Sequence, residues 1–316
     1  MVKRVSLINF KGGVGKTTLA FQFGCWLASQ RDTRVLLCDV DHQSSLSITC
    51  LGGTDWDAAV RGKTTIDKIF RHMTEEASPL PGREIIHHPG GDLGRLYPRL
   101  DVVPSALSLD ETEIDLTGSM RGNAVESEWH KRTLICDWLE KNRIDDDYDY
   151  VLFDCPPATK IVTQNALATS HGYIVPAIPD AVSIRGTPHL TNQILSKIES
   201  QFATLSEFLT TKGKHIASTF VPRRRLVGIV IFRIKPAGSY SGWTNDATEH
   251  YTNLQRIYNH GEIIQPLIEE GVGVSQSLTW RLPVYQFPRH VNIGGRGFPR
   301  IFSEVSRELQ RRIDTL

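Results

Sequence analysis

A glycine-rich segment between a predicted strand and a predicted helix carries the residue types that bind phosphate. Glycines let the backbone turn so that successive N–H groups point at phosphate oxygens, and the N-terminus of the following helix adds the positive end of its dipole. Lys16 can reach the β- and γ-phosphates of a nucleotide, the Thr17 hydroxyl can ligate Mg²⁺, and Thr18 can donate to the α-phosphate. The segment reads Lys11-Gly12-Gly13-Val14-Gly15-Lys16-Thr17-Thr18.

The segment departs from the GxxxxGK[ST] pattern at its start, where Phe10 occupies the usual first glycine position and a second lysine, Lys11, follows. With that lysine the sequence resembles the deviant Walker A ATPases of the ParA/MinD group. The resemblance implies that Lys11 reaches across an ATP-sandwiched homodimer and neutralises charge that develops during phosphoryl transfer. The alternative is a solvated loop lysine without such a role.

Two aspartates, Asp39 and Asp41, end a second predicted strand at the edge of the sheet where ligands bind. The segment Cys38-Asp39-Val40-Asp41-His42-Gln43 is similar to the DxDxQ element of the same family. By that resemblance, Asp41 orients or activates the attacking water and Asp39 supports the Mg²⁺ shell. One of the two aspartates could instead cap the helix that starts near Ser44.

A third carboxylate, Asp154, follows the apolar residues 150–153 and precedes Cys155-Pro156-Pro157. A carboxylate at the end of an apolar strand is the Walker B arrangement, which holds Mg²⁺ directly or through water. The DxPP run also resembles the family, and its prolines would stiffen a loop that senses the γ-phosphate. A structural capping aspartate is the alternative.

The resemblance also implies that adenine binds beside a late strand, 226–232. Phe232 and Arg233 are the candidates there, and the alternative is an ordinary buried strand end.

Alternating strand and helix patterns position these residues. Strands are expected at 3–9, 34–40, 100–104, 149–154, 172–178 and 226–232, and helices at 17–30, 125–143, 183–209, 244–260 and 299–316. The alternation predicts an α/β fold: a single, doubly wound, mostly parallel sheet flanked by helices, which the resemblance identifies as the P-loop NTPase fold. We expect one domain over 1–316 with an irregular insertion at about 52–99.

The chain is nearly neutral, with 36 Lys and Arg against 35 Asp and Glu, which excludes a globally basic binder of nucleic acid. Two stretches, 208–245 and 271–303, nevertheless lack acidic residues. Together they predict a local positive face for duplex phosphates, and scattered solvated arginines are the alternative. The residues predicted to contact DNA are Arg223, Arg224, Arg225 and Lys235.

The cysteines and the apolar segments indicate the cellular compartment and the kinds of metal site to expect. The five cysteines include no CxxC pair, which fits a reducing cytosol and argues against a zinc or iron–sulfur site. No apolar run approaches the length of a membrane span, and the opening residues do not resemble a secretory signal. The last helix has a polar face of mixed sign, which favours packing on the domain over membrane attachment. We therefore expect a cytoplasmic protein.

Taken with the resemblance, these features predict a ParA-like ATPase with ATP and Mg²⁺ as cofactors. It would form a homodimer with ATP, bind DNA without sequence preference, and hydrolyse ATP slowly until a ParB-like or cargo-adaptor protein stimulates it. Alternatives are a MinD-like ATPase on a membrane surface, a metabolic enzyme on the same scaffold, and a nucleotide-gated scaffold with little turnover.

Overall fold

A six-stranded parallel sheet forms the centre of the molecule, with strand order β3-β2-β4-β1-β5-β6. The computed structural model describes residues 1–76, 78–235, 243–258, 261–286 and 297–316. The strands are β1 (Lys3–Leu7), β2 (Val35–Asp39), β3 (Leu100–Val103), β4 (Tyr150–Asp154), β5 (Gly172–Ala177) and β6 (Arg225–Ile231). Each lies within the range predicted for it or within one residue of it, because near-continuous apolar runs are typical of strands covered on both faces.

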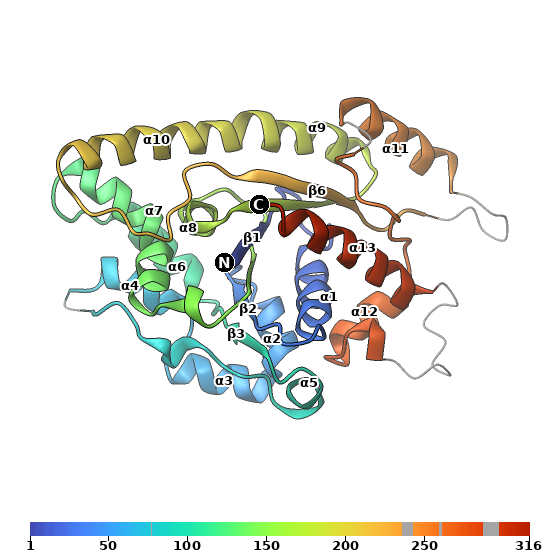
Figure 1. The fold of residues 1–316 in the computed structure, drawn as a ribbon, viewed down its shortest axis with the longest axis horizontal. Helices are drawn as coiled ribbons and strands as arrows, with labels where there is room; N and C mark the ends of the chain where they lie inside the picture. The colour runs from blue at the N-terminus through green and yellow to red at the C-terminus, as the bar shows by residue number, and fades with distance from the viewer. Residues whose placement is uncertain (77, 236–242, 259–260, 287–296) are drawn as a thin grey trace.

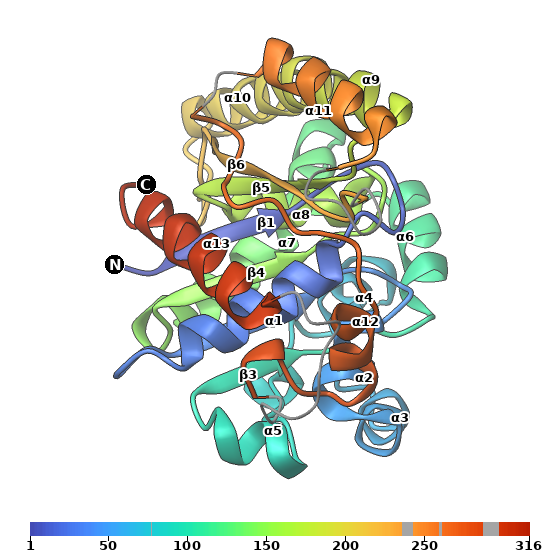
Figure 2. The same ribbon diagram turned by 90° about the vertical axis from the view of Figure 1, so that its right-hand side faces the viewer.

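Helices cover both faces of this sheet, which confirms the predicted doubly wound α/β fold (Figures 1 and 2). Successive side chains of β2 point to opposite faces of the sheet. Val35 and Leu37 belong to the apolar cluster that also contains residues of α1 and α13, whereas Leu36 and Cys38 belong to the cluster that contains residues of α7 and α8. The helices are α1 (Lys16–Ala28), α2 (Ser45–Leu51), α3 (Gly53–Arg61), α4 (Asp67–Thr74), α5 (Gly91–Leu96), α6 (Leu109–Gly118), α7 (Ala124–Lys141), α8 (Ile161–Thr169), α9 (Ala181–His189), α10 (Leu195–Thr211), α11 (Asn245–Ile257), α12 (Val272–Thr279) and α13 (Phe298–Ile313).

The last helix, α13, packs on the domain, as its sequence predicts. Its apolar residues Phe302, Val305, Leu309 and Ile313 are fully buried in the cluster that also contains α1. Within the described residues, no helix has the length and apolar character needed to cross a membrane.

The segment 52–99 is more regular than we predicted, because it contains the three short helices α3, α4 and α5. Prolines and glycines recur along the segment, and they make the helical spacing of the apolar residues between them hard to recognise. On α4 and its preceding residue, Ile66, Ile69, Phe70 and Met73 follow helical spacing and are buried in the main core. The segment is also attached to the sheet, because His87 exchanges backbone hydrogen bonds with Val102 of β3 at 2.8 Å in both directions.

The helix predicted at 183–209 extends from Ala181 to Thr211 as one rod along the top of Figure 1, with a π-helical turn at Leu190–Ile194 between α9 and α10. Pro188 lies inside α9, just before the turn. Proline lacks the N–H that a regular helix would use, and π-turns are one way in which a helix accommodates such an interruption.

Arg224, predicted to contact DNA, is instead a buried structural residue. Its Nε donates to the carbonyl of Leu167 at 2.6 Å, its Nη2 donates to the carbonyl of Val221 at 2.7 Å, and its guanidinium lies 4.9 Å from the centre of the Phe202 ring. Burial lowers the pKa of Arg224 to about 10. A side chain that is 1% exposed and donates to the carbonyls of Leu167 and Val221 is not available to a duplex. The prediction for this residue was therefore wrong.

Replacing Arg224 with alanine should lower the free energy of unfolding by about 2–4 kcal/mol, since it leaves buried carbonyls without a donor and removes packing against Phe202. Arg223→Ala is the matched control, because Arg223 is exposed and its loss should change the same quantity by less than about 0.5 kcal/mol. Urea unfolding of both variants measures this difference. Equal midpoints for the two variants would contradict the structural role.

Candidate functional site

The phosphate-binding loop follows β1 directly, and its glycines adopt conformations that other residues disfavour. Gly13 has a φ of +72° and Gly15 a φ of +98°, both in the left-handed region. Helix α1 then begins at Lys16, and no side chain caps its N-terminus. The first N–H groups of a helix have no partner within it, so this end of α1 offers donors and a positive dipole end to an anion.

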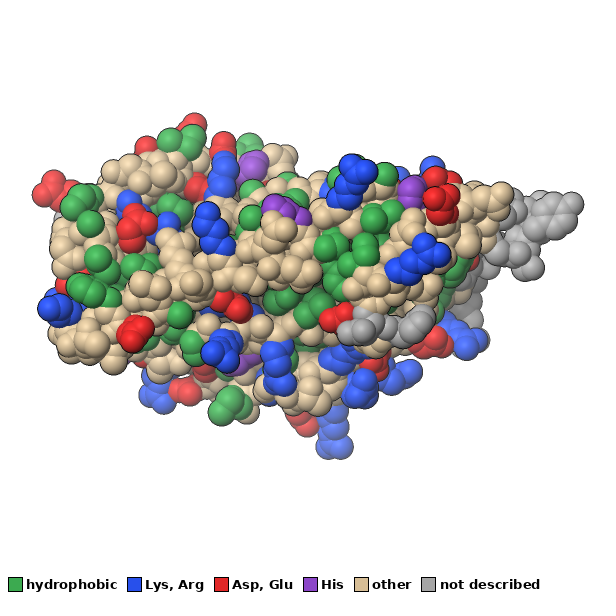
Figure 3. Space-filling view, turned by 90° about the horizontal axis from the view of Figure 1, so that it is seen from above, with side chains coloured by type: hydrophobic (Ala, Val, Ile, Leu, Met, Phe, Trp, Pro, Cys, Tyr) green, Lys and Arg blue, Asp and Glu red, His purple; other side chains and the backbone are tan. Residues whose placement is uncertain are grey.

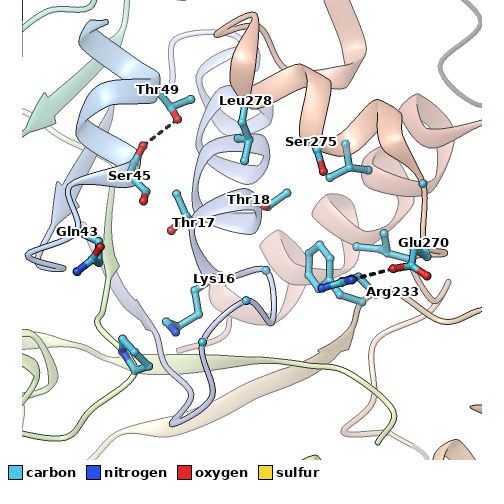
Figure 4. A pocket seen from close by; sticks show the side chains of 18 of the residues that line it. Lys16, Thr17, Thr18, Gln43, Ser45, Thr49, Arg233, Glu270, Ser275 and Leu278 are labelled. Atoms are coloured by element: carbon cyan, nitrogen blue, oxygen red, sulfur yellow. Dashed lines mark hydrogen bonds and ion pairs between the residues drawn. The ribbon is translucent and has the colours of Figure 1, made fainter. Parts of the chain in front are cut away.

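A cavity of about 820 Å³ opens at this helix end and contains most of the predicted site (Figure 4). A volume of this size accommodates a nucleotide-sized ligand. Its lining includes nine predicted site residues: Gly12, Gly13, Gly15, Lys16, Thr17, Thr18, Asp41, Phe232 and Arg233. Four predicted residues, Lys11, Val14, Asp39 and Asp154, do not line it. The side chain of Val14 is fully buried, so only its backbone can serve a ligand.

Lys16 is buried among carboxylates at the base of the cavity. The residue is 7% exposed, and its Nζ donates to the carbonyl of Lys11 at 3.3 Å. Burial lowers the pKa of Lys16, and the negative charges of Asp154 and Asp41 oppose this effect. A cation in this position, next to open helix N–H groups, is well placed to receive phosphate oxygens.

Asp154 fits a Mg²⁺ site because one of its buried oxygens has no partner. Its Cα is in register with Leu7 of β1 and Asp39 of β2, so the strands themselves place it behind the phosphate loop. Its Oδ2 has no hydrogen-bond partner among the described residues. Burial, with a contribution from Asp39, raises the pKa of Asp154 well above its usual range, while the Thr17 hydroxyl and Lys16 act in the opposite direction.

The donor set at Asp154 suits Mg²⁺. Among the described residues, no group of three or more His, Cys, Asp or Glu side chains is arranged to hold a metal ion. Mg²⁺ at nucleotide sites takes one or two protein oxygens and completes its shell with phosphate oxygens and water. The Thr17 hydroxyl and the free oxygen of Asp154 fit that requirement.

Asp39 and Asp41 differ in what their oxygens do. Asp39 is fully buried, its Oδ2 accepts from the N–H and the hydroxyl of Ser47 at 2.9 and 2.6 Å, and its Oδ1 accepts from the N–H of Asp41 at 3.1 Å. Burial raises the pKa of Asp39 to about 7, against these hydrogen bonds. Asp39 thus caps α2, which was the alternative for one of the two aspartates. Oδ1 of Asp41 accepts from the N–H of Gln43 at 3.0 Å and lies 3.8 Å from Nδ1 of His42, and Asp41 faces the cavity.

Lys11 forms an ion pair within its own chain. Its Nζ contacts Oδ2 of Asp180, and the other oxygen of Asp180 accepts from the N–H of Ser183 at 2.8 Å, which caps α9. The resemblance implies a contact of Lys11 with a second chain. In this single chain Lys11 lines a smaller cavity of about 270 Å³ next to the main one, together with Gly12 and Gly13.

The apolar end of the main cavity is where a base would lie. Phe232 lines it, and a Cβ on Gly15 would come within 2.9 Å of the Phe232 ring, so the loop and the ring are closely apposed. Arg233 is exposed, and its Nη2 donates to Oε1 of Glu270 at 2.8 Å. The cavity has further lining residues that the sequence did not predict, and they are Ile268, Glu269, Glu270, Gly271, Val274, Ser275 and Leu278. Since these residues are mostly apolar or small, no motif distinguished them.

The basic residues predicted to contact DNA do not form one face. Arg223 and Arg225 are exposed at the amino end of β6, and Lys235 is exposed beyond its carboxyl end. On the side of α9 and α10, Lys and Arg side chains are interspersed with Asp and Glu (Figure 3). Three further basic residues of the second acid-free stretch, Arg289, His290 and Arg296, lie outside the described residues.

Comparisons with known proteins agree with this geometry. Residues 2–207 match the AAA_31 family, described as an AAA domain. The chromosome partitioning protein ParA of Caulobacter vibrioides is 26% identical over 309 residues, which cover 98% of this chain and 96% of that protein. The virulence plasmid ParA family protein pGP5-D of Chlamydia psittaci is 27% identical over 280 residues, which cover 88% of this chain and 84% of that protein.

Solved structures share the fold. Apo McdA of Cyanothece aligns with a TM-score of 0.67 at 18% identity, over 98% of this chain and 100% of that one. The pNOB8 ParA bound to nonspecific DNA aligns with a TM-score of 0.58 at 18% identity, over 100% of this chain and 99% of that one. With the loop, the carboxylates and the sheet described above, these matches lead to one conclusion: the chain belongs to the AAA_31 family and is a P-loop ATPase of the ParA/MinD type.

Proposed function

We propose that this protein is a ParA-like partition ATPase that dimerises with ATP, binds DNA without sequence preference and hydrolyses ATP slowly. A ParB-like or cargo-adaptor protein would stimulate hydrolysis, reset the dimer and so move DNA or a protein cargo. The observation that carries the proposal is the meeting of Lys16, Asp41 and Asp154 at one edge of the sheet, with a second lysine, Lys11, at the loop entry.

Each residue of the site would have a separate role in ATP hydrolysis. The N–H groups at the start of α1 and the ammonium of Lys16 would hold and neutralise the phosphates, and Thr17 with Asp154 would hold Mg²⁺, which supplies charge stabilisation to the phosphates. Asp41 faces the cavity with an oxygen available to orient a water molecule. Lys11 would have to leave Asp180 to reach a second nucleotide across a dimer.

For DNA we favour the amino edge of the sheet. Arg223 and Arg225 are exposed there, and Lys3 lies nearby, since Arg225 and Lys3 donate to the adjacent carbonyls of Thr315 and Leu316 at 2.7 and 3.0 Å. Exposed arginines and lysines on one edge suit phosphate contacts that carry no sequence information. A relative solved as a complex with nonspecific DNA supports this part of the proposal.

Replacing Lys16 with alanine should weaken ATP binding by about 100-fold or more, because it removes the charged donor nearest the phosphates. Titration with a fluorescent ATP analogue measures the loss. Lys212→Ala removes an exposed lysine at the end of α10 and should leave affinity unchanged. Wild-type affinity in the Lys16 variant would place the phosphates elsewhere.

Replacing Asp41 with alanine should slow ATP hydrolysis by about 100-fold or more while ATP still binds, since water orientation is lost but the phosphate contacts remain. Single-turnover hydrolysis, with and without DNA, separates the two effects. Asp57→Ala changes an exposed aspartate on α3 and is the control. Normal turnover in the Asp41 variant would show that another group orients the water. Negligible turnover in the wild type, even with DNA, would favour a nucleotide-gated scaffold.

Reversing two charges, Arg223→Glu with Arg225→Glu, should weaken ATP-dependent DNA binding and lower the slope of log affinity against log salt by about 2. Binding to duplexes of unrelated sequence at several salt concentrations provides the slope. Lys235→Glu, at the other end of β6, should leave the slope unchanged. If the slope responds to Lys235 and not to the arginine pair, the DNA face lies at the carboxyl edge.

A further inference from the structure

Arg281 joins two helices that lie on opposite sides of the nucleotide cavity. Its Nε donates to the carbonyl of Thr49 at 3.2 Å, and its Nη2 donates to the carbonyl of Cys50 at 3.0 Å. These carbonyls belong to the last turn of α2, and Arg281 itself follows the end of α12. The last carbonyls of a helix lack partners within it and carry the negative end of its dipole, so a guanidinium there is a favourable cap.

The local backbone is shaped around this contact. Arg281 has a φ of +56°, in the left-handed region that non-glycine residues disfavour. Opposite it, Gly52 has a φ of +78°, and a Cβ there would lie 2.3 Å from Nη1 of Arg281. A side chain at position 52 would therefore displace the guanidinium. Two unusual backbone positions, more than 200 residues apart in the chain, are thus adapted to one contact.

The two joined helices supply facing walls of the cavity. Thr49 projects from α2 and Leu278 from α12, and Figure 4 shows both side chains directed toward the space above Thr17 and Thr18. The other end of α2 is already fixed, because Asp39 binds the N–H and the hydroxyl of Ser47. Arg281 therefore fixes the remaining end of α2 and sets its distance from α12.

The phosphate loop takes no part in the contact between Arg281 and α2. The guanidinium of Arg281 donates to carbonyls of α2, and Arg281 does not line the cavity. Phosphate binding through Lys16 and Thr17 is therefore separable from the spacing of the two walls. A ligand that has only phosphates would not sense that spacing, whereas a ligand with a base and a ribose would.

We propose that Arg281 is a positioning residue that holds α2 against α12 and so shapes the part of the cavity that receives the nucleoside. This inference rests on the proposed ATP site and goes beyond it, because it assigns the fit of the base and ribose to a residue that touches neither. It predicts that loss of Arg281 reduces binding of a nucleotide much more than binding of inorganic tripolyphosphate.

Calorimetric titration of the full chain with MgATP and with inorganic tripolyphosphate tests this. Arg281→Gln should weaken ATP binding by about tenfold, since charged hydrogen bonds to the α2 carbonyls are lost, and change tripolyphosphate binding by less than about twofold. Arg281→Lys keeps a cation beside the carbonyls and should recover part of the ATP affinity. Arg300→Gln is the matched control, since Arg300 is an exposed arginine on α13 that pairs with Glu304 one turn away.

A second variant, at Gly52, disturbs the contact between Arg281 and α2 without changing Arg281 itself. Gly52→Ala leaves Arg281 in the chain but obstructs its guanidinium, and it should reproduce the selective loss of ATP affinity. Equal losses for ATP and tripolyphosphate, or unchanged ATP affinity in both variants, would overturn the inference. Thermal unfolding of each variant without ligand shows whether the substitution unfolds the protein. If unfolding accounts for the loss of ATP affinity, the positioning role is also overturned. Failure of the wild type to bind ATP would instead refute the proposed function.

Discussion

The site depends on burying one ammonium among carboxylates at the end of a parallel sheet. Lys16 lies at the start of α1, and Asp154 ends the neighbouring strand β4 in register with the end of β1. Burial lowers the pKa of Lys16, and the charges of Asp154 and Asp41 oppose this effect. Burial also raises the pKa of Asp154, and a cation that approaches its unpartnered Oδ2 would stabilise the charged carboxylate. Phosphate and Mg²⁺ together would satisfy both groups.

This electrostatic arrangement requires the parallel register of β1, β2 and β4. Because the carboxyl ends of parallel strands meet at one edge, residues far apart in the chain reach one cavity without long loops. Asp39 shows how the scaffold also serves the site. Its Oδ2 accepts from Ser47 in the first turn of α2, and its Oδ1 accepts from the N–H of Asp41 and so holds the loop that carries Asp41. The far end of α2 is capped by Arg281, so this short helix is held at both ends.

The sheet and the phosphate loop could be predicted from the sequence because their signals are local. A run of apolar residues followed by glycines, lysine and threonine specifies strand, loop and helix N-terminus together. The lining residues within 268–278 could not be predicted, since no local pattern distinguishes apolar and small residues that line a cavity from others. The contact of Arg281 with α2 was equally hidden, because it joins segments far apart in the chain. Arg224 illustrates the same limit: three consecutive arginines look alike in sequence, and only packing against Phe202 separates the buried one from its exposed neighbours. The helices within 52–99 were missed because prolines and glycines outnumber the few buried apolar positions that define them.

The central claim is that ATP at this site joins two copies of the chain. Lys11, paired with Asp180 in the single chain, is the residue through which a second copy would contribute to the reaction. The most direct test is the molar mass of the protein, measured by light scattering after size exclusion, with a non-hydrolysable ATP analogue, with ADP and without nucleotide. If ATP joins two copies of the chain, we expect a dimer with the analogue and a monomer in the other two conditions. The same mass in all three would contradict it.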